Sequence, residues 1–167
     1  GAPELVAFVG AGGKKTAMAQ LVESGATRGR RVGYTTTTHT PPPTGLPLVL
    51  ASPDELSDAL VPGTPHGRAT DTESSAMDRP DPPAEPVAFA SERVPEPDRA
   101  DEKLRGFEPS VVDDVFGSGR FDWLLVKADG ARRREIKAPG EDEPQVPAAA
   151  TVVVAVASVA AVGEPLT

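Results

Sequence analysis

The chain has 167 residues, a length typical of one domain, and it contains no cysteine, which excludes disulfides, thiolate metal sites and a cysteine nucleophile. Two histidines argue against a histidine-based metal cage, and a net charge of −8 disfavours general binding to nucleic acids. The first 40 residues are nevertheless basic overall. No segment resembles a secretory signal or a membrane-spanning helix, so we expect a cytoplasmic protein that does not bind membranes.

The first third of the chain predicts alternating strands and helices. A glycine-rich turn separates the first strand from a helix over residues 17–23, which Gly25 is expected to end. Ser52 and Glu55 have the spacing of a capping box, which predicts a second helix that continues to about Leu60. The strands expected here cover residues 5–9, 31–37 and 48–51.

The remainder predicts a loop-rich centre followed by regular elements. Residues 62–106 are rich in proline and acidic side chains, so we expect a loop-rich or mobile insertion with an edge strand at 86–90. A helix is expected at 110–116, a strand at 121–126 and a buried strand at 151–157. The chain is expected to be a single domain over residues 1–167.

These elements indicate an α/β fold. A strand, a glycine-rich turn, a helix and a second strand form a βαβ unit, and strands without alternating polarity are typical of a mostly parallel sheet flanked by helices. Ligands of such sheets bind beyond the carboxyl ends of the strands. The loops expected at that edge are residues 10–16, 37–43 and 127–134.

The first of these loops is a candidate phosphate-binding loop. Glycines allow successive N–H groups to point at an anion, a lysine reaches the phosphates, and a hydroxyl binds Mg²⁺. The sequence has a short G-x-G-G-K form, in which Lys15 occupies the usual hydroxyl position and Thr16 comes one residue late. Either Lys14 is the phosphate lysine or Lys15 and Thr16 take these roles; the alternative is a glycine turn without a ligand. The candidate nucleotide-binding residues here are Gly10, Ala11, Gly12, Gly13, Lys14, Lys15 and Thr16.

Residues after two other strands are candidates for the same site. Asp129 follows a strand and is a candidate Mg²⁺ ligand together with Thr16, although Asp-Gly also suits a plain turn. Thr37, Thr38 and His39 are candidates for contacts beside the phosphates, or are strand filler and an exposed loop histidine. Residues 132–134 and 141–143 are interpreted chiefly as solvated charge runs, the first with an arginine clamp as its alternative.

Seven segments, taken together, resemble a known family. They include the glycine-rich loop, a threonine-rich strand end, a K-L-x-G element, an A-D-G-x-R strand end and a K-A-P element. In order and spacing the chain is similar to the YqeC-like selenium-dependent hydroxylase accessory proteins. The segments are Val9–Thr16, Thr35–Pro42, Lys103–Gly106, Lys127–Arg132, Ile136–Pro139, Glu141–Pro147 and Val162–Leu166.

The resemblance implies a P-loop NTPase-like fold that binds ATP or GTP with Mg²⁺. It also implies a role in maturing molybdenum-cofactor hydroxylases, with a hydroxylase or a cofactor-maturation protein as partner. Lys127 and Asp129 would be the catalytic residues. Lys127 stands where the family has Glu, Lys15 where it has a hydroxyl, and Asp142 where it often has His; the first two put hydrolysis in doubt more than binding.

Two other functions stay open, and so does the end of the chain. One is a non-catalytic scaffold that recognises a phosphorylated cofactor or a partner protein through a degenerate loop. The other is a small-molecule kinase on the same fold. The family usually continues past the last matched segment, so a C-terminal portion is expected to be absent, or the protein is a short member.

Overall fold

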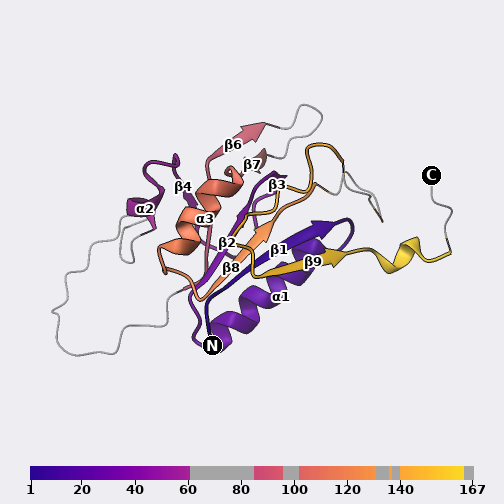
Figure 1. Ribbon diagram of the computed structural model, residues 1–167, viewed down its shortest axis with the longest axis horizontal. Coiled ribbons are helices and arrows are strands. Elements are labelled where there is room, and N and C mark those ends of the chain that lie inside the picture. The colour runs from indigo at the N-terminus through magenta and orange to yellow at the C-terminus, as the bar shows by residue number, and fades with distance from the viewer. Residues whose placement is uncertain (61–84, 96–101, 131–135, 137–139, 164–167) are drawn as a thin grey trace.

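Six parallel strands form the central sheet, in the order β4-β5-β2-β8-β1-β9. The computed structural model describes residues 1–60, 85–95, 102–130, 136 and 140–163. Figure 1 shows β1 lying between β8 and β9. The strands are β1 (Glu4–Gly10), β2 (Val32–Thr36), β4 (Leu48–Leu50), β5 (Val87–Ala90), β8 (Trp123–Lys127) and β9 (Val152–Val156). The expected α/β fold with a mostly parallel sheet is confirmed.

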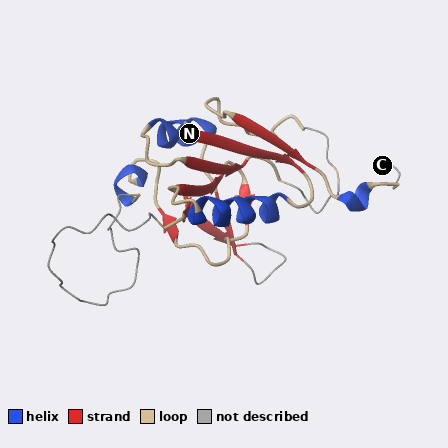
Figure 2. Ribbon diagram, turned by 90° about the horizontal axis from the view of Figure 1, so that it is seen from below, coloured by secondary structure: helices blue, strands red, loops and turns tan. Residues whose placement is uncertain are grey.

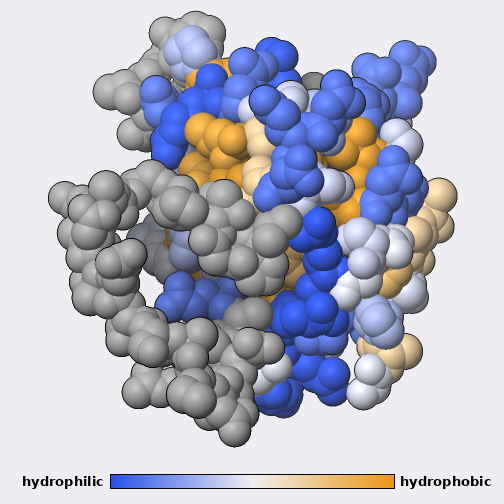
Figure 3. Space-filling model, turned by 90° about the vertical axis from the view of Figure 1, so that its left-hand side faces the viewer, coloured by the Kyte–Doolittle hydropathy of each residue, from blue (hydrophilic) through white to orange (hydrophobic). Residues whose placement is uncertain are grey.

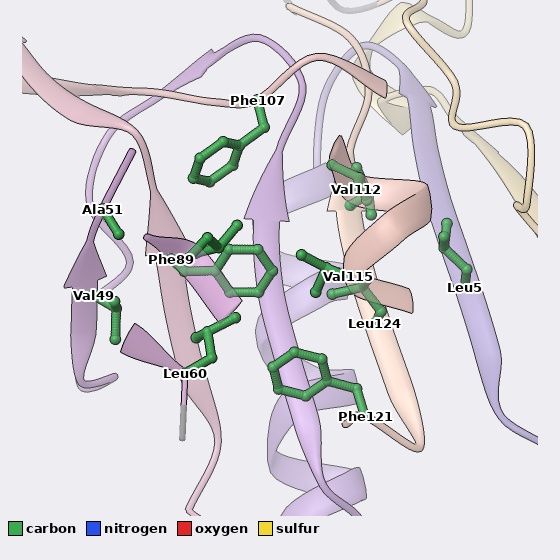
Figure 4. Packing of buried hydrophobic residues seen from close by; sticks show 12 residues of the cluster. Leu5, Val49, Ala51, Leu60, Phe89, Phe107, Val112, Val115, Phe121 and Leu124 are labelled. Atoms are coloured by element: carbon green, nitrogen blue, oxygen red, sulfur yellow. The ribbon is translucent and has the colours of Figure 1, made fainter. Parts of the chain in front are cut away.

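Helices cover both faces of this sheet (Figure 2). Consecutive strand residues point to opposite faces, so Leu5 packs in the cluster with α3 and its neighbour Val6 packs against the cluster under α1. In the first cluster the rings of Phe89 and Phe121 stack 5.8 Å apart (Figure 4). Burial on both faces explains the continuous apolar runs. The helices are α1 (Lys14–Thr27), α2 (Leu56–Ala59), α3 (Pro109–Gly117) and the 3-10 turn η1 (Val159–Ala161).

The edges of the sheet differ from the sequence-based expectation. β5 was expected at an edge, but it lies between β4 and β2. The edge on the other side is β9, which was expected to be buried, and Val152 and Val153 are 42% and 54% exposed. Both expectations were wrong for one reason: a short apolar run does not reveal how many neighbours its strand has.

A second, antiparallel sheet of three strands, β3-β7-β6, is built around the carboxyl end of β2. The N–H of Gly106 donates to the Thr38 carbonyl (2.8 Å) and that of Phe107 to the Thr36 carbonyl (3.0 Å). Regular strands therefore occupy part of the segment that was expected to be loop-rich, while residues 61–84 and 96–101 lie outside the described residues. The strands of this sheet are β3 (His39–Thr40), β6 (Glu92–Pro95) and β7 (Glu102–Arg105).

Ser52 and Glu55 form one half of the expected capping box, and the helix behind them is shorter than expected. The Glu55 carboxylate accepts hydrogen bonds from the Ser52 hydroxyl (2.6 Å) and the Ser52 N–H (3.2 Å). Residues 53–55 form a turn, and α2 is a single turn of helix that begins at Leu56.

No described helix has the length and apolar character needed to cross a membrane. On the face in Figure 3, hydrophilic side chains surround smaller apolar areas.

Gly25 does not end α1 as expected but lies buried inside it. A Cβ at this position would be 2.5 Å from Cγ2 of Val32 and 2.9 Å from Cε3 of Trp123. The missing side chain thus lets the helix approach β2 and β8 closely. The chain turns out of the helix at Gly29, whose φ of +65° favours glycine.

We expect Gly25→Ala to destabilise the fold by about 1–2 kcal/mol, because overpacking outweighs the gain in helix propensity. Gly117→Ala is the matched control, since nothing lies within 4 Å of a Cβ added there, and it should be neutral or stabilise by about 0.5 kcal/mol. Urea unfolding of both variants measures this. Equal stability of the two variants would contradict the close packing of α1.

Candidate functional site

The glycine-rich loop connects the carboxyl end of β1 to the first turn of α1. Gly10, Gly12 and Gly13 have φ angles of +86°, +67° and +86°, in the left-handed region that favours glycine. Ala11 is buried, and its N–H donates to the Val156 carbonyl (2.8 Å), which fixes the loop to the end of β9. The loop therefore has a defined shape, and the N-terminus of a 14-residue helix opens directly behind it.

Two buried charged side chains are held at Gly10. Lys14 is 3% exposed, and its ammonium donates to the Gly10 carbonyl. Asp129, 2% exposed, accepts the Gly10 N–H through Oδ2 (3.0 Å). The structure thus brings Asp129, 119 residues away in sequence, to the start of the loop, because β8 is the direct neighbour of β1.

Lys127 lies at the end of β8, within the same buried region. Its ammonium donates to the His39 carbonyl (2.7 Å) and to the Thr38 hydroxyl (3.1 Å). The Thr36 hydroxyl donates to the Lys127 carbonyl (2.8 Å). Lys127 therefore ties the main sheet to β3 of the small sheet.

The pKa of Lys127 is lowered from 10.5 to about 8. Burial is the main cause and the positive charge of Lys14 adds to it, whereas the carboxylates of Glu143 and Asp129 act in the opposite direction. Because Lys14, Glu143 and Asp129 all act on the Lys127 amine, two ammonium groups and two carboxylates lie in this part of the molecule. In a chain with a net charge of −8, such a concentration of lysines is a distinctive feature.

The threonine-rich strand end is engaged in holding the rim together. The Thr37 hydroxyl donates to the Gln145 carbonyl (2.7 Å), and the Gln145 N–H donates to the Ala128 carbonyl (2.8 Å). His39 is largely exposed, and its pKa is lowered by the partial loss of solvent around its ring and then by the charges of Arg105 and Lys103. These residues lie at the expected edge; their contact with phosphate stays a prediction.

Lys15 and Thr16 lie on the exposed side of the first turn of α1, unlike the buried Lys14. Both are exposed and line a cavity on the flank of the helix together with Tyr34. Asp129, by contrast, is buried against Gly10. The pairing of Thr16 with Asp129 at a metal ion stays a prediction.

Glu143 is the residue that sequence reasoning missed, because residues 141–143 were interpreted as a solvated turn. It is half-buried, and its Oε1 would lie 3.0 Å from a Cβ added at Gly130. No local pattern indicates this, since long-range pairing of the 140–147 segment with Ala128 and Thr37 brings it there. Residues 131–135 and 137–139, which include the arginine run, lie outside the described residues.

The lowered pKa of Lys127 predicts that stability increases with alkaline pH. Between about pH 8 and 10.5 the unfolded chain binds more protons at this side chain than the folded protein does, so unfolding becomes harder as pH rises. From pH 7 to pH 9.5 the free energy of unfolding should increase by about 2 kcal/mol. Measurements stay below pH 10 because burial raises the pKa of Tyr34, whose ionisation in the unfolded chain acts in the opposite direction.

Urea unfolding of the wild type and of Lys127→Met at several pH values from 7 to 9.5 tests this. Methionine has a similar length but no titratable group, so the increase should be absent in the variant whatever its stability at pH 7. The same pH slope in both proteins would contradict the buried position of the Lys127 amine.

Comparison with known proteins identifies the family. The family model described as YqeC protein matches residues 6–167. "Uncharacterized protein YqeC" of Escherichia coli (strain K12) is 31% identical over 156 residues, which are 92% of this chain and 51% of that protein. The chain thus spans about half the length of this relative. No solved structure is significantly similar to the present chain. Matched over nearly its whole length, the chain belongs to the YqeC family.

Proposed function

We propose that this protein is a nucleotide-binding accessory factor with a P-loop-type fold that binds the phosphates of ATP or GTP on its glycine-rich loop. The observation that carries the proposal is the loop itself. Three glycines with positive φ lie between a buried parallel strand and a long helix, with Lys14 at the first helical position. Backbone N–H groups and a helix N-terminus in this arrangement favour an anion.

The charges around the loop support the same proposal. Lys14 is folded back onto the Gly10 carbonyl, and an incoming phosphate offers it a charged acceptor in place of that neutral one. Lys127 is buried nearby with a lowered pKa, so a bound anion would stabilise its protonated form. Phosphate binding would thus relieve the crowding of two ammonium groups in one buried place.

The residues at this site would bind a magnesium ion only together with the phosphates of a nucleotide. Within the described ranges, no three His, Cys, Asp or Glu side chains are grouped to hold a metal. Mg²⁺ commonly binds one or two carboxylates together with substrate phosphates and water, and Asp129 at the loop suits that arrangement. Asp129, with Thr16 if its hydroxyl reaches the ion, would hold Mg²⁺, which would offset the charge of the phosphates.

Binding without turnover is the second candidate function, and Lys127 favours it. The carboxylates of Glu143 and Asp129 both act on its ammonium, which would therefore compete with Mg²⁺ for Asp129. Hydrolysis by the family's implied chemistry would then be slow or absent. The role as a maturation factor for molybdenum hydroxylases rests on the family motifs, and a nucleotide-dependent contact with such a protein fits either candidate.

Calorimetric titration separates these functions. ATP, GTP and inorganic tripolyphosphate are titrated into the wild type and Asp129→Asn, with and without Mg²⁺, and released phosphate is measured in parallel. Micromolar binding of both nucleotide and tripolyphosphate supports the proposal. Dependence on Mg²⁺ that is lost in Asp129→Asn assigns the metal role. Absence of binding by the folded protein overturns the proposal.

A further inference from the structure

A cavity of about 550 Å³ opens along one flank of α1, next to the glycine-rich loop. This volume lies in the range of pockets that hold small organic molecules. Its walls come from α1, from β2 and from the connection between β3 and β4. The lining residues are Lys15, Thr16, Ala19, Val22, Glu23, Tyr34 and residues 42–46.

The position of the cavity relates it to the loop. Lys15 and Thr16 are on the first turn of α1, and Val22 and Glu23 are two turns further on, so the cavity extends roughly 10 Å from the loop along the helix. Tyr34 lies on β2, and β2 is paired with β8, the strand that leads to Asp129. The cavity is therefore on the β8 side of the loop, away from β9.

This side is where the proposed chemistry lies. Under the proposed function, Asp129 would hold a Mg²⁺ that offsets the charge of the outer phosphates of a nucleotide. The terminal phosphate is then expected toward β8 and β2, and the nucleoside away from them. A cavity on the β8 side therefore adjoins the terminal phosphate rather than the base.

The lining defines the chemistry of an occupant. Ala19, Val22, Tyr34 and Leu46, together with two prolines, offer mostly apolar walls for a flat body. Lys15 is exposed at the end nearest the loop and supplies a positive charge there, while the carboxylate of Glu23 lies two turns of helix away from it, so an anionic group is favoured at the loop end. A molecule with an apolar, planar body and one anionic group matches both features.

We propose that this cavity is a second ligand site, which binds a small aromatic anion beside the nucleotide rather than the nucleoside part of it. The placement of this ligand next to a terminal phosphate rests on the proposed function. The existence of the site does not rest on the proposed function, because the walls of the cavity and Lys15 are present whether or not a nucleotide binds.

The test uses 8-anilinonaphthalene-1-sulfonate, a fluorescent dye with an aromatic body and one anionic group. The wild type should bind one dye molecule per chain. Ala19→Trp fills the cavity from an exposed helix position and should weaken dye binding about tenfold, and Lys15→Gln should weaken it severalfold. Gln20→Trp, on an exposed neighbour outside the lining, is the matched control and should bind like the wild type.

Nucleotide titrations complete the test. Saturating ATP should leave dye affinity within about twofold, and Ala19→Trp should bind ATP and tripolyphosphate like the wild type. Equal dye affinity in Ala19→Trp and Gln20→Trp overturns the site. Competition between ATP and dye, with Ala19→Trp weakening ATP but not tripolyphosphate, also overturns it and assigns the cavity to the nucleoside. Dye binding sensitive to Ala19→Trp in a protein that binds neither ATP nor tripolyphosphate supports the site and refutes only the proposed function.

Discussion

Lys14→Ala should weaken the binding of ATP or GTP by about 100-fold, the largest loss of affinity that we expect from a single side chain. Two charge-assisted hydrogen bonds to phosphate, at about 1.5 kcal/mol each, account for this magnitude. The side chain lies at the first position of α1 and already bonds within the loop, so little reorganisation separates it from a bound phosphate. Calorimetry with ATP and tripolyphosphate measures the loss, which should be similar for both ligands.

Two comparisons make this result specific. Lys15→Ala removes an exposed lysine next in sequence and should have a much smaller effect on tripolyphosphate binding. Lys14→Ala should also raise the pKa of Lys127, because the charge of Lys14 lowers that pKa in the wild type. Unchanged nucleotide affinity in Lys14→Ala, with the shift of the Lys127 pKa present, would show that the loop does not hold the phosphates.

Gly106→Ala should cause the largest loss of stability, at least about 3 kcal/mol, which is a large part of the stability of an ordinary domain. A Cβ at Gly106 would lie 2.5 Å from the carbonyl carbon of Thr36 and closer still to its oxygen. Because the obstacle is backbone, no rotation of a side chain relieves the clash. The chain would have to move away from the end of β2 and lose the hydrogen bond from the Gly106 N–H to the Thr38 carbonyl.

Thermal and urea unfolding of Gly106→Ala measure this loss, with Gly117→Ala as the control for an alanine in open space. The variant should also lose nucleotide affinity, since the displaced threonines contact Lys127. A variant as stable as the wild type would contradict the close packing of Gly106 against the Thr36 carbonyl at the end of β2.

Local patterns predicted the part of this fold that depends on local structure. The apolar run before Gly10 and the glycines after it indicated a buried strand and a tight turn into a helix, and the position of Asp129 followed from its place after another buried strand. The position of Glu143 beside Gly130 could not be predicted in this way. It depends on pairing between residues that are far apart in sequence, and a run of three acidic residues is usually solvated.

The dependence on contacts between distant residues also explains the wrong predictions for β5, β9 and Gly25. The order of strands placed β5 inside the sheet and β9 at its edge, which no property of either segment indicated. Gly25 suggested the end of a helix, but its function is to let α1 pack closely on Trp123. In each case a tertiary contact decided the outcome.

Backbone amide NMR during a titration with ATP and Mg²⁺ tests the central claim most directly. If the loop binds the phosphates, the amide signals of Gly12, Gly13 and Lys14 should shift first and most, and tripolyphosphate should reproduce these shifts. Nucleotide binding that leaves these three amides unchanged, or no binding at all, would contradict the account.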